Sequence, residues 1–63
     1  MNFTEGLAFI SMRLGEVAEH DMDLPEAARL YEESVGYFER LGSPVAEQVK
    51  RMLERVRQQM GNG

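Results

Sequence analysis

Apolar residues recur every three or four positions along the first part of the chain, which is the spacing of one helical face. The members of this apolar stripe are Phe3, Leu7, Ile10, Leu14 and Val17. A second apolar set on the same segment comprises Ala8, Phe9, Met12 and Ala18. Together the two sets widen the apolar arc beyond what one small neighbouring helix covers. The pattern predicts a helix over about residues 4–20, with Thr4 as its N-cap and two packing neighbours.

A tight turn and a second helix are predicted next. Asp23 is placed as an N-cap, Pro25 falls in the first helical turn, and Glu26 stands three residues after Asp23 as a capping-box partner. The apolar positions then continue at helical spacing, which predicts a helix over residues 24–41. Gly36 lies inside this helix at a cost of about 1 kcal/mol relative to Ala, and we take it as a sign of close packing.

The run Gly42-Ser43-Pro44 marks the end of the second helix and the start of a third over residues 44–60. Gly is typical after a helix C-terminus, Ser is a good N-cap, and Pro is favoured at the first helical position. Apolar residues form a narrow stripe on the third helix, which is therefore amphipathic. The predicted fold is all-α: a helix-turn-helix hairpin and a third amphipathic helix, within a single domain over residues 1–63.

The hairpin resembles one tetratricopeptide (TPR) repeat. The resemblance covers about residues 7–41 and rests on Leu14, Gly15, Ala27, Tyr31 and Ser34. It implies that Gly15 lets the second helix pass close to the first, that the third helix acts as a cap, and that the chain binds other polypeptides. Each unit of such a repeat buries its apolar face mainly against neighbouring units.

Three positions depart from the repeat pattern. Ser11 and Ala18 stand where the family has bulky aromatic side chains, and Met22 stands at the usual turn glycine. The missing bulk at Ser11 and Ala18 suggests that side chains of a partner fill these gaps, as they would at a dimer interface.

The size of the chain also favours association. A chain of 63 residues buries only about 60% of its unfolded surface. The absence of cysteine excludes disulfides and thiolate metal sites as sources of stability. We therefore expect a protein–protein interaction or oligomerisation module, and in particular a homodimeric helical bundle with two-fold symmetry. The alternative is a small helical regulator that sequesters a signalling or transcription protein on the same face.

Seven residues of the first helix are the candidate partner-binding residues: Phe3, Leu7, Phe9, Ile10, Met12, Arg13 and Glu16. The TPR resemblance implies a concave side on the first helix that would suit an amphipathic helical peptide with basic flanks. The residues it places there are Phe9, Met12, Arg13, Glu16 and His20. The other interpretation is that Phe9 and Met12 fill the core or the seam of a dimer.

Charge and motifs give little support to other classes of function. The net charge of −4 argues against nucleic-acid binding, and no apolar run resembles a membrane span or signal peptide, so we expect a soluble cytoplasmic protein. His20 and its acidic neighbours are interpreted as a solvated turn rather than a metal site. The serines have capping or helix-interior roles, and the glycines form no phosphate loop. Neither catalysis nor a cofactor is predicted.

Overall fold

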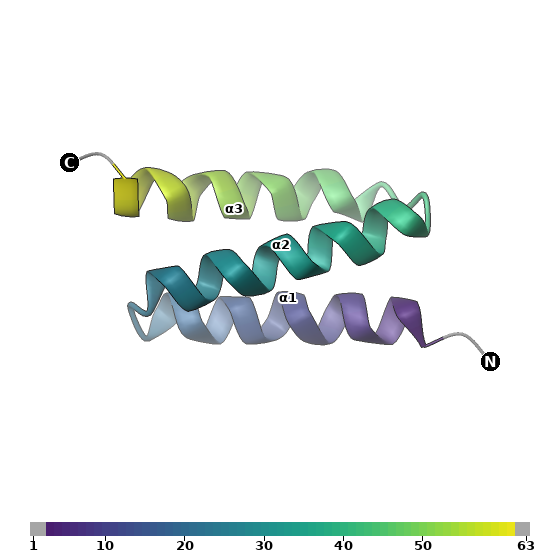
Figure 1. Ribbon diagram of the computed structural model, residues 1–63, viewed down its shortest axis with the longest axis horizontal. Helices are drawn as coiled ribbons and strands as arrows, with labels where there is room; N and C mark the ends of the chain where they lie inside the picture. Colours follow the sequence, from purple (N-terminus) through teal and green to yellow (C-terminus); the bar gives the residue numbers. More distant parts are fainter. Residues whose placement is uncertain (1–2, 62–63) are drawn as a thin grey trace.

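The computed structural model describes residues 3–61, which form an antiparallel arrangement of three α-helices (Figure 1). The helices are α1 (Thr4–His20), α2 (Leu24–Arg40) and α3 (Val45–Gly61). Their ends lie within one residue of the ranges predicted from the sequence. In this part of the chain the all-α prediction is confirmed, and α2 lies between α1 and α3.

The turn after α1 closes with a pair of backbone hydrogen bonds. Asp23 N–H donates to the carbonyl of Ala18 at 2.8 Å, and Met22 N–H donates to the carbonyl of Glu19 at 3.0 Å. This is the Schellman arrangement, which places the residue after the C-cap in the left-handed region. Here that residue is Met22, with a φ of 62°, so a non-glycine side chain occupies a conformation that glycine adopts at no steric cost.

The turn after α2 repeats this geometry. Ser43 N–H donates to the carbonyl of Phe38 at 2.9 Å, and Gly42 N–H donates to that of Glu39 at 3.0 Å. Gly42 has a φ of 66° and supplies the residue type that the motif prefers. Ser43 Oγ then accepts a hydrogen bond from Val45 N–H at 3.2 Å, as expected of a capping serine, but α3 begins at Val45 and not at Pro44 as predicted.

The starts of the first two helices differ from the prediction in detail. Thr4 is the first helical residue and not the N-cap; the N-cap is Phe3, whose carbonyl accepts from Leu7 N–H at 2.9 Å. Asp23 does occupy the N-cap of α2, but its side chain makes no capping hydrogen bond. The capping box with Glu26 is therefore wrong, since the Glu26 carboxylate binds Arg29 instead.

The core lies on both sides of α2. The largest fully buried side chains are Tyr31 and Phe38 on α2 and Val49 and Val56 on α3. Burial of these apolar side chains is the main favourable contribution to folding. Gly36 lies outside this core: no atom comes within 4 Å of a Cβ built there, so the close packing predicted at Gly36 is wrong.

Candidate interaction surface

The side of α1 that packs on α2 consists of small residues. This small-residue face comprises Ala8, Ser11, Gly15 and Ala18, all of them buried. A Cβ built on Gly15 would lie only 2.6 Å from Cε1 of the Tyr31 ring. The close approach of the two helices predicted at Gly15 is therefore present. Ser34 Oγ also donates a hydrogen bond of 2.8 Å to the carbonyl of Ala8, which ties α2 to the backbone of α1.

Burial of the small-residue face corrects one prediction. Ser11 and Ala18 retain only 7% and 9% of their accessible surface within a single copy of the chain. No gap is left there for side chains of a partner, because α2 approaches closely enough to cover both positions itself.

The apolar stripe lies on a different side of α1 and is uncovered. Its five members keep between 45% (Leu7) and 68% (Phe3) of their surface exposed. At 100° per residue, the middle of the stripe is turned by about 100° from the middle of the small-residue face. Thus α1 presents two apolar faces nearly at right angles, and within residues 3–61 only the face with small side chains is covered.

Two residues of α2 extend the exposed apolar surface. Tyr37 is half-buried, and Leu41, at the C-cap of α2, is 37% exposed. Both lie on the flank of α2 away from α3, since Glu32 and Glu39, on the opposite flank, form ion pairs with Arg57 and Lys50 of α3. The flank that carries Tyr37 and Leu41 therefore borders α1 on the side of the stripe.

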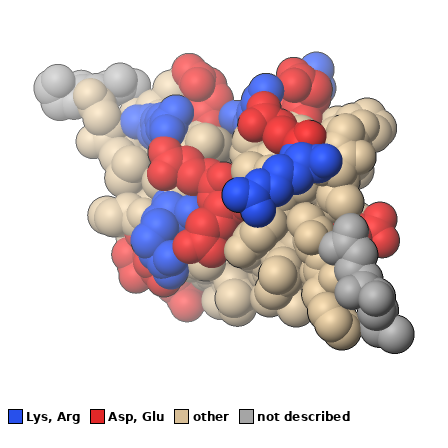
Figure 2. All heavy atoms as spheres, turned by 45° about the vertical axis from the view of Figure 1, so that its right-hand side comes forward, with Lys and Arg blue, Asp and Glu red and all other residues tan. Residues whose placement is uncertain are grey.

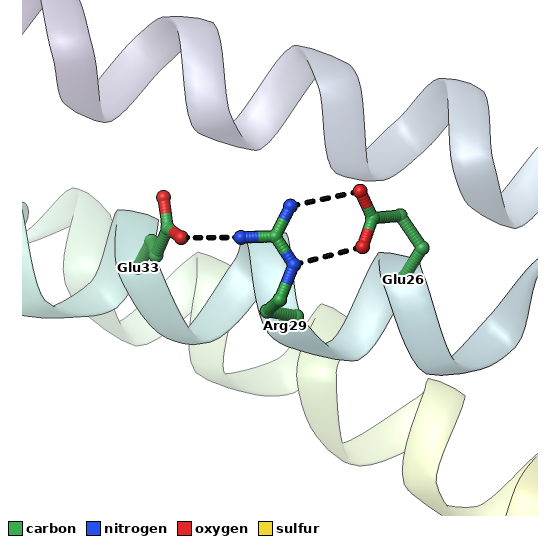
Figure 3. Close-up of polar contacts among 3 residues, drawn as sticks. All are labelled: Glu26, Arg29 and Glu33. Atoms are coloured by element: carbon green, nitrogen blue, oxygen red, sulfur yellow. Dashed lines mark hydrogen bonds and ion pairs between the residues drawn. The ribbon is translucent and has the colours of Figure 1, made fainter.

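Charged side chains surround this surface without entering it. On the face that Figure 2 shows, acidic and basic side chains gather in the upper and left parts of the view, whereas the lower part towards the right is mainly uncharged. On α2, Arg29 binds Glu26 through two hydrogen bonds of 2.8 Å and Glu33 through one of 2.6 Å (Figure 3). These exposed carboxylates have a cation of their own chain as partner, and the Arg29 hydrogen bonds lower the pKa of Glu26.

The remaining candidate residues are divided between the core and the solvent. Phe9 is 40% exposed and packs edge-on against Phe38, with ring centroids 5.0 Å apart. Met12 is partly buried against the core. Glu16 is exposed on the part of α1 away from the stripe, whereas Arg13, three residues after Ile10 and four before Val17, is exposed at the edge of the stripe. The structure thus separates Phe9, Met12 and Glu16 from Phe3, Leu7 and Ile10, although all are predicted to bind the same partner, and it places Arg13 at the edge of the stripe.

One polar cluster joins all three helices and was not predicted from the sequence. The Glu19 carboxylate of α1 accepts a hydrogen bond from Tyr31 Oη of α2 at 2.9 Å, and two from Arg55 of α3, each 2.9 Å. The hydrogen bond from Arg55 is the main reason that the pKa of Glu19 lies below its ordinary value; burial opposes it, and Tyr31 reinforces it. Burial and the carboxylate raise the pKa of the Tyr31 hydroxyl. No local pattern points to Glu19, because its partners lie on different helices.

Beside this cluster is a shallow, open depression lined by Glu16, Glu19, His20, Met22, Arg55 and Gln59. Its least exposed carboxylate, that of Glu19, is already bound by Arg55 and Tyr31. Within residues 3–61, no group of three or more His, Asp or Glu side chains is placed to hold a metal ion. Among the same residues, no helix has the length and apolar character needed to cross a membrane.

Comparison of the chain with protein-family models, curated proteins and solved structures finds no match. The exposed apolar stripe is therefore the main observation that bears on function.

Proposed function

We propose that this chain is a protein–protein interaction module that binds through the apolar stripe of α1. The observation that carries the proposal is the exposure of five large apolar side chains in one continuous row. Taking roughly 150–200 Å² for a large apolar side chain, the stripe exposes on the order of 500 Å². This is within the size of the largest apolar patch on monomeric proteins, and such a patch is often a functional site.

The packing of α1 supports the proposal because it explains why the stripe stays uncovered. The small-residue face already holds α2, with Gly15 against Tyr31 and Ala8 bound by Ser34. The polar cluster at Glu19 holds α3 on the far side of α1 from the stripe. No other helix of residues 3–61 remains to cover the stripe, which is the reason for proposing a further polypeptide as its occupant.

We also propose that the hairpin is a single TPR-like unit with α3 as its cap. The Gly15–Tyr31 approach is the packing that this resemblance implies. A repeat unit leaves one apolar side for the next unit, and the stripe is a side of that kind. This proposal predicts that the occupant of the stripe is helical.

Site-specific photo-crosslinking tests the proposed function. A photoreactive amino acid is placed at Leu14 in the stripe, and at Met60 on α3 as a matched control, since Met60 is also an exposed apolar residue. We expect the probe at Leu14 to crosslink to protein, either itself or another chain, and the substitution Ile10→Lys to remove that product. Equal labelling from both positions, or none from Leu14, would contradict the proposal.

A further inference from the structure

We infer that the occupant of the stripe is a second copy of this chain, with the two α1 helices antiparallel and α2 of each copy completing a four-helix bundle. This inference rests on the proposed function and names the partner for it. It is carried by the area of the stripe, the angle between the two faces of α1, and the charges at the rim.

The area matches what a dimer needs. Each copy offers on the order of 500 Å² from the stripe, so two copies would bury about 1,000 Å² from the stripes alone, which is the lower bound for a specific interface. Tyr37 and Leu41 of α2 add to this area. The stripe is one continuous row along α1. A two-fold axis perpendicular to α1 therefore places the stripe of one copy against the stripe of the other.

The spacing of the stripe suits two α1 helices packed side by side. Steps of four, three, four and three residues follow a seven-residue repeat, which keeps one seam of a helix facing its partner. Leu7, Ile10 and Leu14 form the middle of this seam. Maximum overlap of the two stripes places the axis near Ile10 and sets Leu7 of one copy opposite Leu14 of the other.

The angle of about 100° between the two apolar faces determines the position of α2. With the α1 helices antiparallel across a perpendicular two-fold axis, α2 and its symmetry mate fall on the same side of the pair. The four helices then occupy the corners of a square, as in a four-helix bundle. Tyr37 and Leu41 face the seam between the two α2 helices, and α3 lies outside the bundle. A parallel pair would place the two α2 helices on opposite sides and leave these residues uncovered.

The charges at the rim are compatible with this arrangement. Glu26 and Glu33 border the apolar surface, and both are bound to Arg29 of their own chain (Figure 3). When two α2 helices approach, each therefore presents carboxylates that are already paired. This gives an apolar centre and a polar rim, the usual composition of a protein interface.

The test combines sedimentation equilibrium with disulfide trapping. The purified full chain is expected to sediment at twice its monomer mass of 7.2 kDa. Ile10→Lys should raise the dissociation constant at least about 30-fold, as expected for the centre of an interface. Met60→Lys, which places the same charge on α3, should leave it unchanged. Circular dichroism verifies that both variants remain helical.

The orientation is tested with single cysteines, because the natural chain has none. Leu7→Cys and Leu14→Cys chains, mixed and oxidised, should form the mixed disulfide. Each variant alone should stay unlinked, since like positions are offset by about 10 Å along the helices, beyond the roughly 7 Å between Cα atoms that a disulfide spans. Disulfides between like chains would overturn the antiparallel arrangement.

The remaining outcomes separate this inference from the proposed function. If the purified chain stays monomeric at millimolar concentration but the Leu14 probe captures another protein, the second-copy inference is overturned and the proposed function stands. If the chain is monomeric and the probe captures nothing, both are overturned. A dimer that survives Ile10→Lys would place the interface elsewhere and overturn the inference.

Discussion

The two faces of α1 show how differently one helix can use apolar residues. The small-residue face has little side-chain volume, yet it is buried because Gly15 and its neighbours let α2 approach until the Tyr31 ring fills the space. The apolar stripe has far more apolar surface and stays exposed. On α1, close packing inside the chain is therefore achieved where side chains are small, and the row of large side chains stays exposed.

The largest effect should come from adding volume to the small-residue face. Gly15→Ala places a methyl group 2.6 Å from the fully buried Tyr31 ring, which is also held by Glu19. We expect the free energy of unfolding to fall by about 2 kcal/mol, because overpacking outweighs the gain in helix propensity. Gly36→Ala is the matched control: its surroundings are open, so it should raise stability by up to about 1 kcal/mol. Urea denaturation measures both, and the same sign for the two variants would contradict the packing described for Gly15.

A smaller loss should follow when the hydrogen bond across the same face is removed. Ser34→Ala deletes the hydroxyl that binds the carbonyl of Ala8, and Ser34 is fully buried. The free energy of unfolding should fall by about 1 kcal/mol. Urea denaturation measures this change, and an unchanged midpoint would show that this hydrogen bond contributes nothing to the α1–α2 contact.

The Glu19 cluster, which fixes α3 on the other side of α1, should make stability depend on pH. The pKa of Glu19 is lowered in the folded chain, chiefly by Arg55, so its contribution is complete above the ordinary value of 4.5 and is lost as the pH falls through the lower folded pKa. Glu19→Gln should cost about 1 kcal/mol at neutral pH and should flatten the loss of stability in acid. Thermal unfolding across the pH range measures this. Glu26→Gln removes one partner of an exposed ion pair and serves as the control. It should change the dependence of stability on pH in the acid range less than Glu19→Gln does. If wild type and Glu19→Gln lost stability equally as the pH falls, the role given to Glu19 would be contradicted.

The smallest effect on folding should come from the stripe itself. Leu14 is about half exposed, so Leu14→Gln removes little buried surface and should change the stability of the monomer by less than about 0.5 kcal/mol. Denaturation at protein concentrations low enough to dissociate any complex measures this. A loss above about 2 kcal/mol would mean that the stripe belongs to the core of the chain.

The sequence predicts the helices well because their signals are local. The apolar spacing and the turn residues around Pro25 and Gly42 place the helix ends within one residue. The N-cap of α1 is an exception, because Thr4 has the preferred residue type but Phe3 takes the position. The end of α1 also carries Met22 where glycine is favoured, and the helix still closes with the same hydrogen bonds as α2.

Which face of α1 is buried could not be predicted from the same signals. The helical spacing of apolar residues identifies a row of large apolar side chains. It does not show whether that row packs against its own chain or against another molecule. The burial of Ser11 and Ala18 depends on how closely α2 approaches, which is set by the contact between Gly15 and Tyr31. The hydrogen bonds of Glu19 could not be predicted for a related reason, because its partners Tyr31 and Arg55 lie 12 and 36 residues away from it in the sequence. For the candidate site, the exposure of Phe3, Leu7 and Ile10 agrees with a role in binding, which stays a prediction.

In our proposal, the small-residue face of α1 packs inside the chain while the apolar stripe packs against a second chain. Isotope-filtered nuclear Overhauser spectroscopy on a mixture of labelled and unlabelled chains tests this proposal directly. We expect intermolecular contacts among the methyl groups of Leu7, Ile10 and Leu14, and only intramolecular contacts for the methyl group of Ala8. Intermolecular contacts from Ala8, or contacts from Ile10 that are confined to its own chain, would contradict it.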